Sequence, residues 1–317
     1  MEKITEVISR MEIKVYKNGM HILDEGEKDF FTSFLEKMDS SSQKKYIYRG
    51  NHNLISQYKT DTNDLPLLSE KIFMVGEKGK NMWQECDTNI EEKKDIIDAL
   101  FENLEKKLRE YCGGDNASYF IKKNLEMCSY FTGVNRDDFR SKITQKGEKI
   151  QQEILDYYYV FLHTLDSNHS EFLSTSENLQ VANRFRNRNG IILVGWVPAQ
   201  EEKKRIIKYI DVNGYYADFV KEVKLPQWHS VYQNEQEICL KCGLLPHYMI
   251  GFITYIENRE CFVINPAILK KDKRGIDDII LDGLVIDQSS FFESLKTTQY
   301  KGYYMFADGE YYRYPND

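Results

Sequence analysis

The chain has 317 residues, of which 41% are hydrophobic and 29% are charged, so it can bury a substantial core and does not belong to the disordered or low-complexity classes. No apolar run approaches the roughly 20 residues that a membrane-spanning helix needs, and the opening sequence MEKITEVISR lacks the apolar stretch of a signal peptide. The net charge of -7 disfavours a protein that coats nucleic acid. We therefore expect a cytoplasmic protein that makes no membrane contact.

Helical patterns dominate the first half of the chain. Apolar residues at helical spacing predict a helix over 29–38, within an N-terminal helical segment that we assign to 1–45. Thr88 and Glu91 form a capping-box pattern that opens a longer amphipathic helix. Further helical patterns follow at 117–131 and 137–165. We interpret 61–165 as a helical insertion or cap.

The second half of the chain changes to short runs of β-type residues separated by turn residues. These runs lie at 171–176, 191–197, 232–240, 249–256, 261–265, 279–286 and 300–306. Because the connections are too short for regular crossover helices, the strands should pair in an antiparallel or mixed sheet. The sequence therefore predicts an α+β fold.

The six cysteines are scattered along the chain, which is typical of reduced thiols in a protein without a secretory signal. Cys239 and Cys242 form a lone C-x-x-C pair, but no second pair of ligands follows at the spacing of a zinc site. Two thiols on a strand and its turn are the simpler interpretation, so we expect no metal.

The first of three polar motifs is Tyr48-Arg49-Gly50, at the end of a short apolar strand. The guanidinium of Arg49 offers a planar fork of donors for a phosphate or a carboxylate. Gly50 carries no Cβ, so a ligand can approach the backbone there. An arginine at a strand end is more often solvated or ion-paired, and this motif alone decides little.

The second motif is Ser174-Thr175-Ser176, a predicted strand that runs into a helix with Ala182 and Phe185 on its buried side. Ser174 and Ser176 share one face of the strand, while Thr175 points to the other. A role as helix N-cap explains Ser176 and leaves Ser174 unexplained.

The third motif is the pair Glu235 and Glu237, which would share one face of the predicted strand 232–240 with Cys239. Two carboxylates on one face repel each other and contribute nothing to folding. They either protect an edge strand from aggregation or perform chemistry.

Taken in order, the three motifs resemble those of the R-S-E class of mono-ADP-ribosyltransferases, the C2/C3-toxin-like and ecto-ADP-ribosyltransferase clan. The resemblance covers 46–50 and about 171–265, and it implies that 46–317 is one ADP-ribosyltransferase-like catalytic domain with a split mixed β-sheet core. The FRG-type domain also begins with an aromatic-Arg-Gly triplet, but it is less similar in the Ser-Thr-Ser and Glu-x-Glu elements. The poly-ADP-ribose polymerase branch, with its His-Tyr-Glu set, does not fit Arg49 and Ser174.

The resemblance implies that NAD is the substrate and that its nicotinamide–ribose bond is cleaved through an oxocarbenium-like state. Glu237 would hold the ribose 2′-hydroxyl and stabilise the cation, Ser174 would position Glu237, and Glu235 would orient or deprotonate the acceptor. The implied NAD-binding residues are Arg49, Gly50, Ser174, Thr175 and Ser176. The implied acceptor-recognition residues are Trp228, Tyr232 and Glu235, with Trp228 either an exposed stacking surface or a core residue.

The implied activity is transfer of ADP-ribose to a macromolecule by a toxin-type or defence-type effector, with a protein arginine as the favoured acceptor. Transfer to a base of RNA or DNA, hydrolysis of NAD by water, and a non-enzymatic ADP-ribosyltransferase-like binding module stay open as alternatives. A toxin-type effector would also have an antitoxin or inhibitor protein as a partner.

Overall fold

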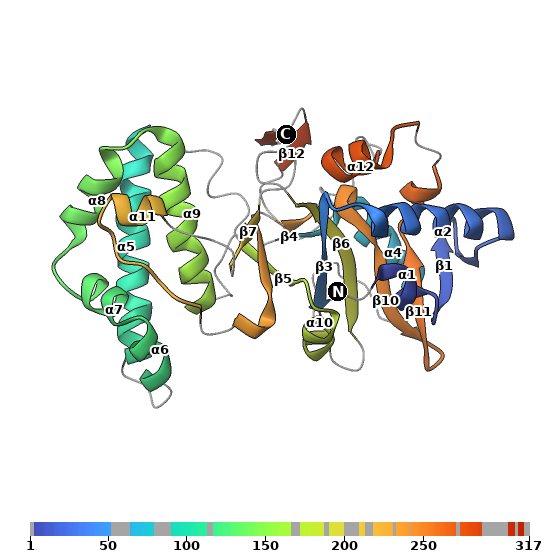
Figure 1. Cartoon of the computed structure of the whole chain (residues 1–317), viewed down its shortest axis with the longest axis horizontal. Coiled ribbons are helices and arrows are strands. Elements are labelled where there is room, and N and C mark those ends of the chain that lie inside the picture. The colour runs from blue at the N-terminus through green and yellow to red at the C-terminus, as the bar shows by residue number, and fades with distance from the viewer. Residues whose placement is uncertain are drawn as a thin grey trace.

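The computed structural model describes residues 3–51, 64–78, 90–112, 117–165, 172–186, 190–199, 209–212, 218–230, 233–241, 243–270, 273–286, 304–307 and 310–313. These residues form an α+β protein around one mixed sheet of nine strands (Figure 1). Helices pack on the sheet, and a second group of helices forms a layer beyond one of its ends, on the left in Figure 1.

The nine strands of the main sheet run in the order β2-β1-β11-β10-β6-β3-β5-β8-β7. Strands β1 and β11 pair in parallel, and the other neighbours in this sheet pair antiparallel. Their bounds are β1 Glu12–Tyr16, β2 Met20–Ile22, β3 Lys44–Asn51, β5 Phe172–Ser176, β6 Ile191–Pro198, β7 Tyr209–Asp211, β8 Glu237–Lys241, β10 Met249–Ile256 and β11 Arg259–Ile264. Two small ribbons pair β4 Glu77–Lys78 with β9 Gly243–Leu244, and β12 Tyr304–Ala307 with β13 Glu310–Arg313.

The described helices fall into a sheet-packed set and a separate layer. The sheet-packed helices are α1 Ile4–Ile8, α2 Glu25–Ser40, α4 Leu65–Val75, α10 Leu179–Arg186 and α12 Ile276–Asp282. The separate layer, which we call the helical unit, consists of α5 Ile90–Cys112, α6 Ala117–Lys123, α7 Leu125–Phe131, α8 Arg136–Thr144, α9 Glu148–Leu165 and α11 Asp218–Glu222. Short 3₁₀ helices are η3 Gln233–Glu235, η4 Pro246–Tyr248 and η5 Pro266–Leu269. Among the described residues, no helix is long and apolar enough to cross a membrane.

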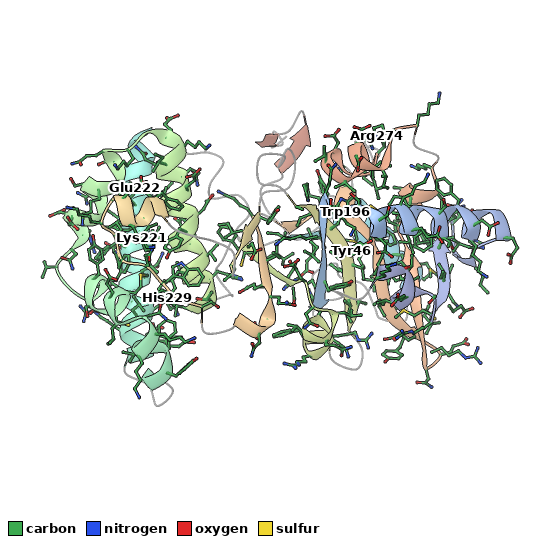
Figure 2. All side chains as sticks on the ribbon, viewed as in Figure 1. Tyr46, Trp196, Lys221, Glu222, His229 and Arg274 are labelled. Atoms are coloured by element: carbon green, nitrogen blue, oxygen red, sulfur yellow. The ribbon has the colours of Figure 1, made fainter. Side chains whose placement is uncertain are left out.

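The sheet core is mainly aliphatic and centres on β6, every residue of which is buried. Because both faces of such a strand are covered, its sequence is a continuous apolar run, as 191–197 is. Trp196, labelled in Figure 2, lies in this core, and its indole nitrogen donates a hydrogen bond to the Ile280 carbonyl of α12 at 3.1 Å. This bond ties the central strand to the helix above it.

The helical unit has a second core, rich in aromatic side chains. Phe131 stands at its centre, with ring centroids of Phe101, Phe139 and Tyr158 between 5.1 and 5.4 Å away. Phe172 of β5 belongs to the same cluster, together with Ile210 and Cys239 from β7 and β8. The aromatic core therefore rests on the end of the sheet that carries β5, β8 and β7.

Some predicted elements are confirmed and others are corrected. The apolar stripe at 29–38 is the buried face of α2, which opens with a capping box between Asp24 and Glu27. The N-terminal segment 1–45 is not wholly helical, because it also contributes β1 and β2 to the sheet. The predicted strand 279–286 is wrong: Ile279 and Ile280 are the buried side of helix α12. A short apolar run fits a buried helix as well as a strand, and length alone did not separate them.

Candidate active site

Residues of all three polar motifs lie on three neighbouring strands: Arg49 on β3, Ser174 on β5 and Glu237 on β8. Tyr48 pairs with Ser176, and Ser176 pairs in turn with Glu237 across the next ladder. This register brings together residues that are far apart in the sequence. Arg49 Nη1 donates to the Ser174 carbonyl oxygen at 2.8 Å, and Ser174 Oγ donates to Glu237 Oε1 at 2.6 Å.

Arg49 is held by a carboxylate that the sequence did not reveal as part of the site. Its Nε donates to Glu77 Oε1 at 2.8 Å, and Asn51 Nδ2 reaches the same oxygen at 2.5 Å. Glu77 is buried, with its other oxygen lacking a hydrogen-bond partner among the described residues, whereas the Arg49 side chain is 24% exposed. The guanidinium is therefore fixed on one side and can turn its remaining N–H groups toward a ligand.

Glu77 reaches this position because α4 ends at Gly76. Gly76 has a φ of +71°, and a Cβ there would lie 2.1 Å from the Leu244 carbonyl oxygen, so a residue with a side chain is strained on both counts. The turn directs Glu77 into a two-residue ladder with β9. In the sequence, a glycine after an apolar helical run indicates the end of a helix, but it does not indicate that Glu77 contacts Arg49.

His163 is the second residue that the sequence did not single out. It lies near the end of α9, is 5% exposed, and places Nε2 at 2.6 Å from Ser174 Oγ and 4.0 Å from Glu237 Oε1. A single histidine in an apolar helix carries no signal for this contact in the sequence. The helical unit thus contributes a side chain to the group formed by the three strands.

The carboxylate of Glu237 is nearly buried and has one oxygen committed to the protein. Oε1 accepts from Ser174, and the Cys239 thiol lies 3.4 Å from it. Burial raises the pKa of the Cys239 thiol well above its ordinary value, and the Glu237 carboxylate adds to this, so the thiol stays neutral and donates. Oε2 makes no hydrogen bond within the part of the chain that the structure describes, and it is the oxygen left for a ligand.

Glu235 is not on the strand with Glu237, contrary to the prediction. It ends the 3₁₀ turn η3, and Gln236 follows with a φ of +46° before β8 begins. Burial raises the pKa of Glu235, the Glu237 carboxylate raises it further, and Arg184 opposes the shift. The two carboxylates are therefore electrostatic neighbours on different backbone elements.

The remaining residues of the first two motifs have structural contacts. Thr175 is buried on the other face of β5 and donates to the Ile238 carbonyl at 2.7 Å. Ser176 Oγ donates to the Glu235 carbonyl at 2.5 Å and accepts from the backbone N–H of Asn178 at 2.9 Å. The side chain of Asn178, and not that of Ser176, caps α10 by accepting from the Gln180 backbone N–H. A Cβ on Gly50 would lie 1.8 Å from the Ala182 carbonyl oxygen. Gly50 therefore allows α10 to pack closely on β3.

The buried side of α10 was assigned wrongly at one position. Phe185 is 54% exposed, while Arg186 is 5% exposed and pairs with Glu260 at 2.9 Å. Three aromatic residues that flank the first two motifs, Tyr46, Tyr48 and Phe172, are buried in the two cores.

The predicted acceptor-recognition turn lies along the helical unit. Trp228 is 8% exposed and packs against Tyr157 and Phe161, with its indole nitrogen 3.2 Å from the Tyr157 carbonyl. His229, Lys221 and Glu222 mark the course of this segment in Figure 2. Trp228 is therefore a core residue and presents no exposed stacking surface. Tyr232 lies outside the described residues.

His163, Glu237 and Cys239 have the composition of a metal-ligand set. Their ligand atoms lie within 4.8 Å of one another, and within the described ranges they are the one group of this kind. Hydrogen bonds through Ser174 Oγ and the neutral thiol already satisfy these atoms without a cation. Cys242, the other member of the C-x-x-C pair, lies outside the described residues.

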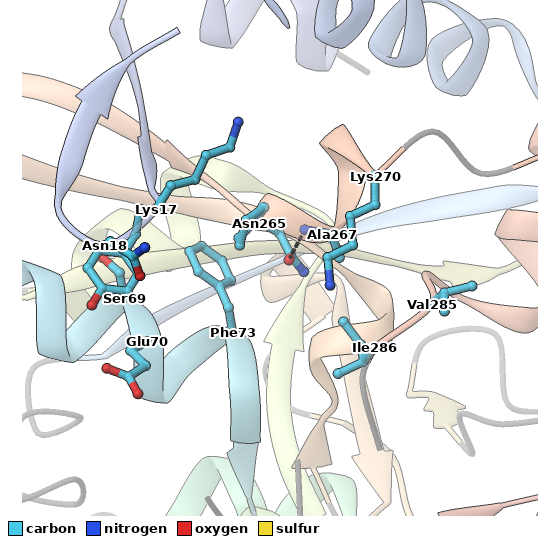
Figure 3. Close-up of a pocket in the computed structure, with 12 residues that line it drawn as sticks. Lys17, Asn18, Ser69, Glu70, Phe73, Asn265, Ala267, Lys270, Val285 and Ile286 are labelled. Carbon is cyan, nitrogen blue, oxygen red and sulfur yellow. Dashed lines mark hydrogen bonds between the residues drawn. The ribbon is translucent and has the colours of Figure 1, made fainter. Parts of the chain in front are cut away.

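A separate pocket of about 240 Å³ opens elsewhere on the sheet-packed side (Figure 3). Lys17 and Asn18 of the β1–β2 turn line it, together with Phe73 of α4 and Lys270 after η5. Arg49, Ser174 and Glu237 are not among its lining residues. It is distinct from the motif-bearing site.

Comparison of the chain with models of protein families, with curated proteins and with solved structures gave no match in any of the three. Interpretation of the site therefore rests on its geometry and on the resemblance of its three motifs.

Proposed function

We propose that the chain is a mono-ADP-ribosyltransferase, which cleaves NAD at the nicotinamide–ribose bond and transfers ADP-ribose to a macromolecular acceptor. The observation that carries the proposal is a pair of hydrogen bonds that links three residues: Arg49 donates to the Ser174 carbonyl, and the Ser174 hydroxyl donates to Glu237. Arg49 and Ser174 are 125 positions apart in the sequence. An arginine, a serine and a glutamate joined in this way match the roles that the motif resemblance implies.

In this proposal Glu237 stabilises the cation that develops as nicotinamide leaves. Its Oε1 is fixed by Ser174, so Oε2 is the oxygen that would accept a hydrogen bond from the ribose 2′-hydroxyl. A carboxylate held in advance stabilises developing positive charge without reorganising during the reaction. The Arg49 guanidinium, fixed by Glu77, would contact the NAD phosphates.

Glu235 would act on the acceptor. Because burial and the adjacent Glu237 carboxylate raise its pKa, it is a stronger base than an ordinary surface glutamate. A base of this kind suits removal of a proton from an acceptor group as that group attacks the ribose. A protein arginine remains the acceptor that the Glu-x-Glu motif favours.

The experiment that tests the proposal is incubation of the chain with NAD labelled in its adenylate half, in the presence of a cell lysate. Label in the protein, RNA or DNA fraction supports transfer and identifies the acceptor class. Absence of both nicotinamide release and labelled product would contradict the proposal.

Glu237→Gln is the matched variant, because it keeps the shape of the side chain and removes its charge. We expect nicotinamide release to fall by about 10² to 10³. Glu36→Gln is the control: Glu36 is exposed on α2, which contributes no residue to the candidate site. Equal activity of the Glu237→Gln variant and the control would contradict the assigned role.

Hydrolysis of NAD by water is a second candidate, and one observation favours it. Trp228, the residue expected to offer an acceptor surface, is buried in the helical unit. With no acceptor platform at that position, water could take the acceptor's place. The labelling experiment separates the two, since hydrolysis gives free ADP-ribose and leaves the macromolecular fractions unlabelled.

A further inference from the structure

His163 connects the helical unit to the group of side chains on the sheet. Its ring lies beside Phe172, with centroids 6.5 Å apart, and its Nε2 lies 2.6 Å from Ser174 Oγ. The same Ser174 oxygen lies 2.6 Å from Glu237 Oε1. One hydroxyl group therefore stands between a histidine and a carboxylate at short hydrogen-bond distances on both sides.

The direction of these two bonds follows from proton counting. A hydroxyl has a single hydrogen to donate, and an ionised carboxylate can only accept. With Glu237 as a carboxylate, Ser174 donates to Oε1 and must accept its other bond. His163 then carries a hydrogen on Nε2 and donates it to Ser174 Oγ.

We propose that His163 is a positioning residue: its Nε2–H holds the Ser174 hydroxyl in the rotamer that donates to Glu237. This inference rests on the proposed function, because a fixed Glu237 Oε1 leaves Oε2 directed at the ribose. Without the donor, the Ser174 hydroxyl is free to rotate and the carboxylate loses a fixed partner. The helical unit thereby contributes to the geometry of the site without touching the substrate.

Two substitutions test separately the hydrogen-bond donor and the aromatic ring of His163. His163→Phe keeps an aromatic ring beside Phe172 and removes the nitrogen, whereas His163→Gln replaces the ring and supplies an amide N–H at a similar reach. We expect His163→Phe to lower kcat for nicotinamide release by about tenfold with KM little changed, the scale of one hydrogen bond to a charged site. His163→Gln should recover most of that loss, with thermal melting checking that both variants are folded.

A double variant tests whether His163 acts through Ser174. In a chain that already carries Ser174→Ala, adding His163→Phe should cost little further activity, because the bond it removes is already gone. Full additivity of the two losses would overturn the proposal. Equal losses in His163→Phe and His163→Gln would overturn it as well, since the ring rather than the donor would then matter.

Histidine-selective ¹⁵N NMR on the full chain gives a readout that needs no activity. His163 should show a protonated Nε2 in the parent protein, and its signal, assigned with His163→Gln, should shift in Ser174→Ala. A bare Nε2 in the parent protein would overturn the assigned bond direction. If nicotinamide is never released, the proposed function fails, while the NMR result still decides whether His163 donates to Ser174.

Discussion

The sheet core and the helical core are built from different residues by different routes. The sheet core is mostly isoleucine, valine and leucine on strands that pair across long stretches of sequence. The helical core packs phenylalanine and tyrosine rings from helices that follow one another along the chain. The candidate site lies where the two meet, because Ser174 and Glu237 come from the sheet and His163 comes from the helical unit. A site at such a junction depends on the correct placement of both cores.

A second polar contact crosses the same junction. Lys241 of β8 is only 8% exposed, and its ammonium donates to Asp156 of α9 at 2.8 Å. Asp156 and His163 lie on the same helix, so α9 is joined to the sheet at two points. We therefore expect the two cores to unfold together.

The largest effect is expected from Phe131→Ala, which opens a cavity at the centre of the helical core. Loss of a buried phenylalanine should lower the free energy of unfolding by about 3–5 kcal/mol. Of the three tryptophans, Trp228 lies in the helical core and Trp196 in the sheet core, so chains that retain Trp228 alone or Trp196 alone can follow each region by fluorescence. Both transitions should move to lower denaturant together.

The control for that substitution is Phe185→Ala, since this side chain is 54% exposed. It should change the free energy of unfolding by no more than about 0.5 kcal/mol. A shift of the Trp228 transition alone in Phe131→Ala would show that the two cores are separately stable units.

A smaller effect is expected from Gly50→Ala, which perturbs the sheet side of the site. The new Cβ would lie 1.8 Å from the Ala182 carbonyl, so β3 and α10 must separate. Overpacking of this kind costs about 1–3 kcal/mol, and it should also displace the adjacent Arg49 and so weaken the proposed binding of NAD. Chemical denaturation and NAD titration measure the two consequences.

Gly147→Ala is the matched control in the helical unit, because nothing lies within 4 Å of the Cβ it would add. This variant should be as stable as the parent or slightly more stable, since alanine restricts the unfolded chain. If Gly50→Ala and Gly147→Ala lose similar amounts of stability, the close contact of Gly50 with Ala182 is not the reason for the glycine at position 50.

The smallest effect is expected from Glu235→Gln. Burial raises the pKa of Glu235 in the folded chain, with the Glu237 carboxylate adding to the shift, so the folded state binds this proton more tightly than the unfolded state. The stability that the group contributes therefore falls as pH rises from the ordinary carboxyl range through the raised pKa. Glu235→Gln should be slightly more stable than the parent at pH 7, with the difference shrinking near pH 4.

Thermal melting at the two pH values measures this difference. Glu36→Gln, at an exposed position of α2, serves as the control for removal of a carboxylate. A Glu235→Gln variant that is less stable than the parent at neutral pH would mean that the carboxylate makes a favourable contact in the folded state.

The sequence predicted those features whose signal is local. The helical spacing of apolar residues predicts α2, and an unbroken run of β-type residues predicts β6. The motif residues Arg49, Ser174 and Glu237 could be named because their order resembles a known set. Their contact depends on the strand order β3-β5-β8, which no local pattern contains.

The features that sequence reasoning missed are set by tertiary context. Glu77 and His163 look like ordinary residues of a charged turn and an apolar helix, and only the packing of α4 and α9 brings them to the site. Glu235 fits an alternating strand pattern, yet the positive φ of Gln236 places it on a 3₁₀ turn. Buried Trp228 follows from the docking of its segment on α9, which depends on contacts with Tyr157.

The parallel pairing of β1 with β11 has a consequence for the order of folding. Glu12 of β1 lies opposite Cys261 of β11, so this edge of the sheet cannot form until most of the chain has left the ribosome. The helical unit needs mainly residues 90–165, which are contiguous, and local contacts form faster than distant ones. During synthesis the aromatic helices should assemble first, and β1 should pair with β11 last, after the strands β3, β5 and β8 that carry the candidate site have emerged.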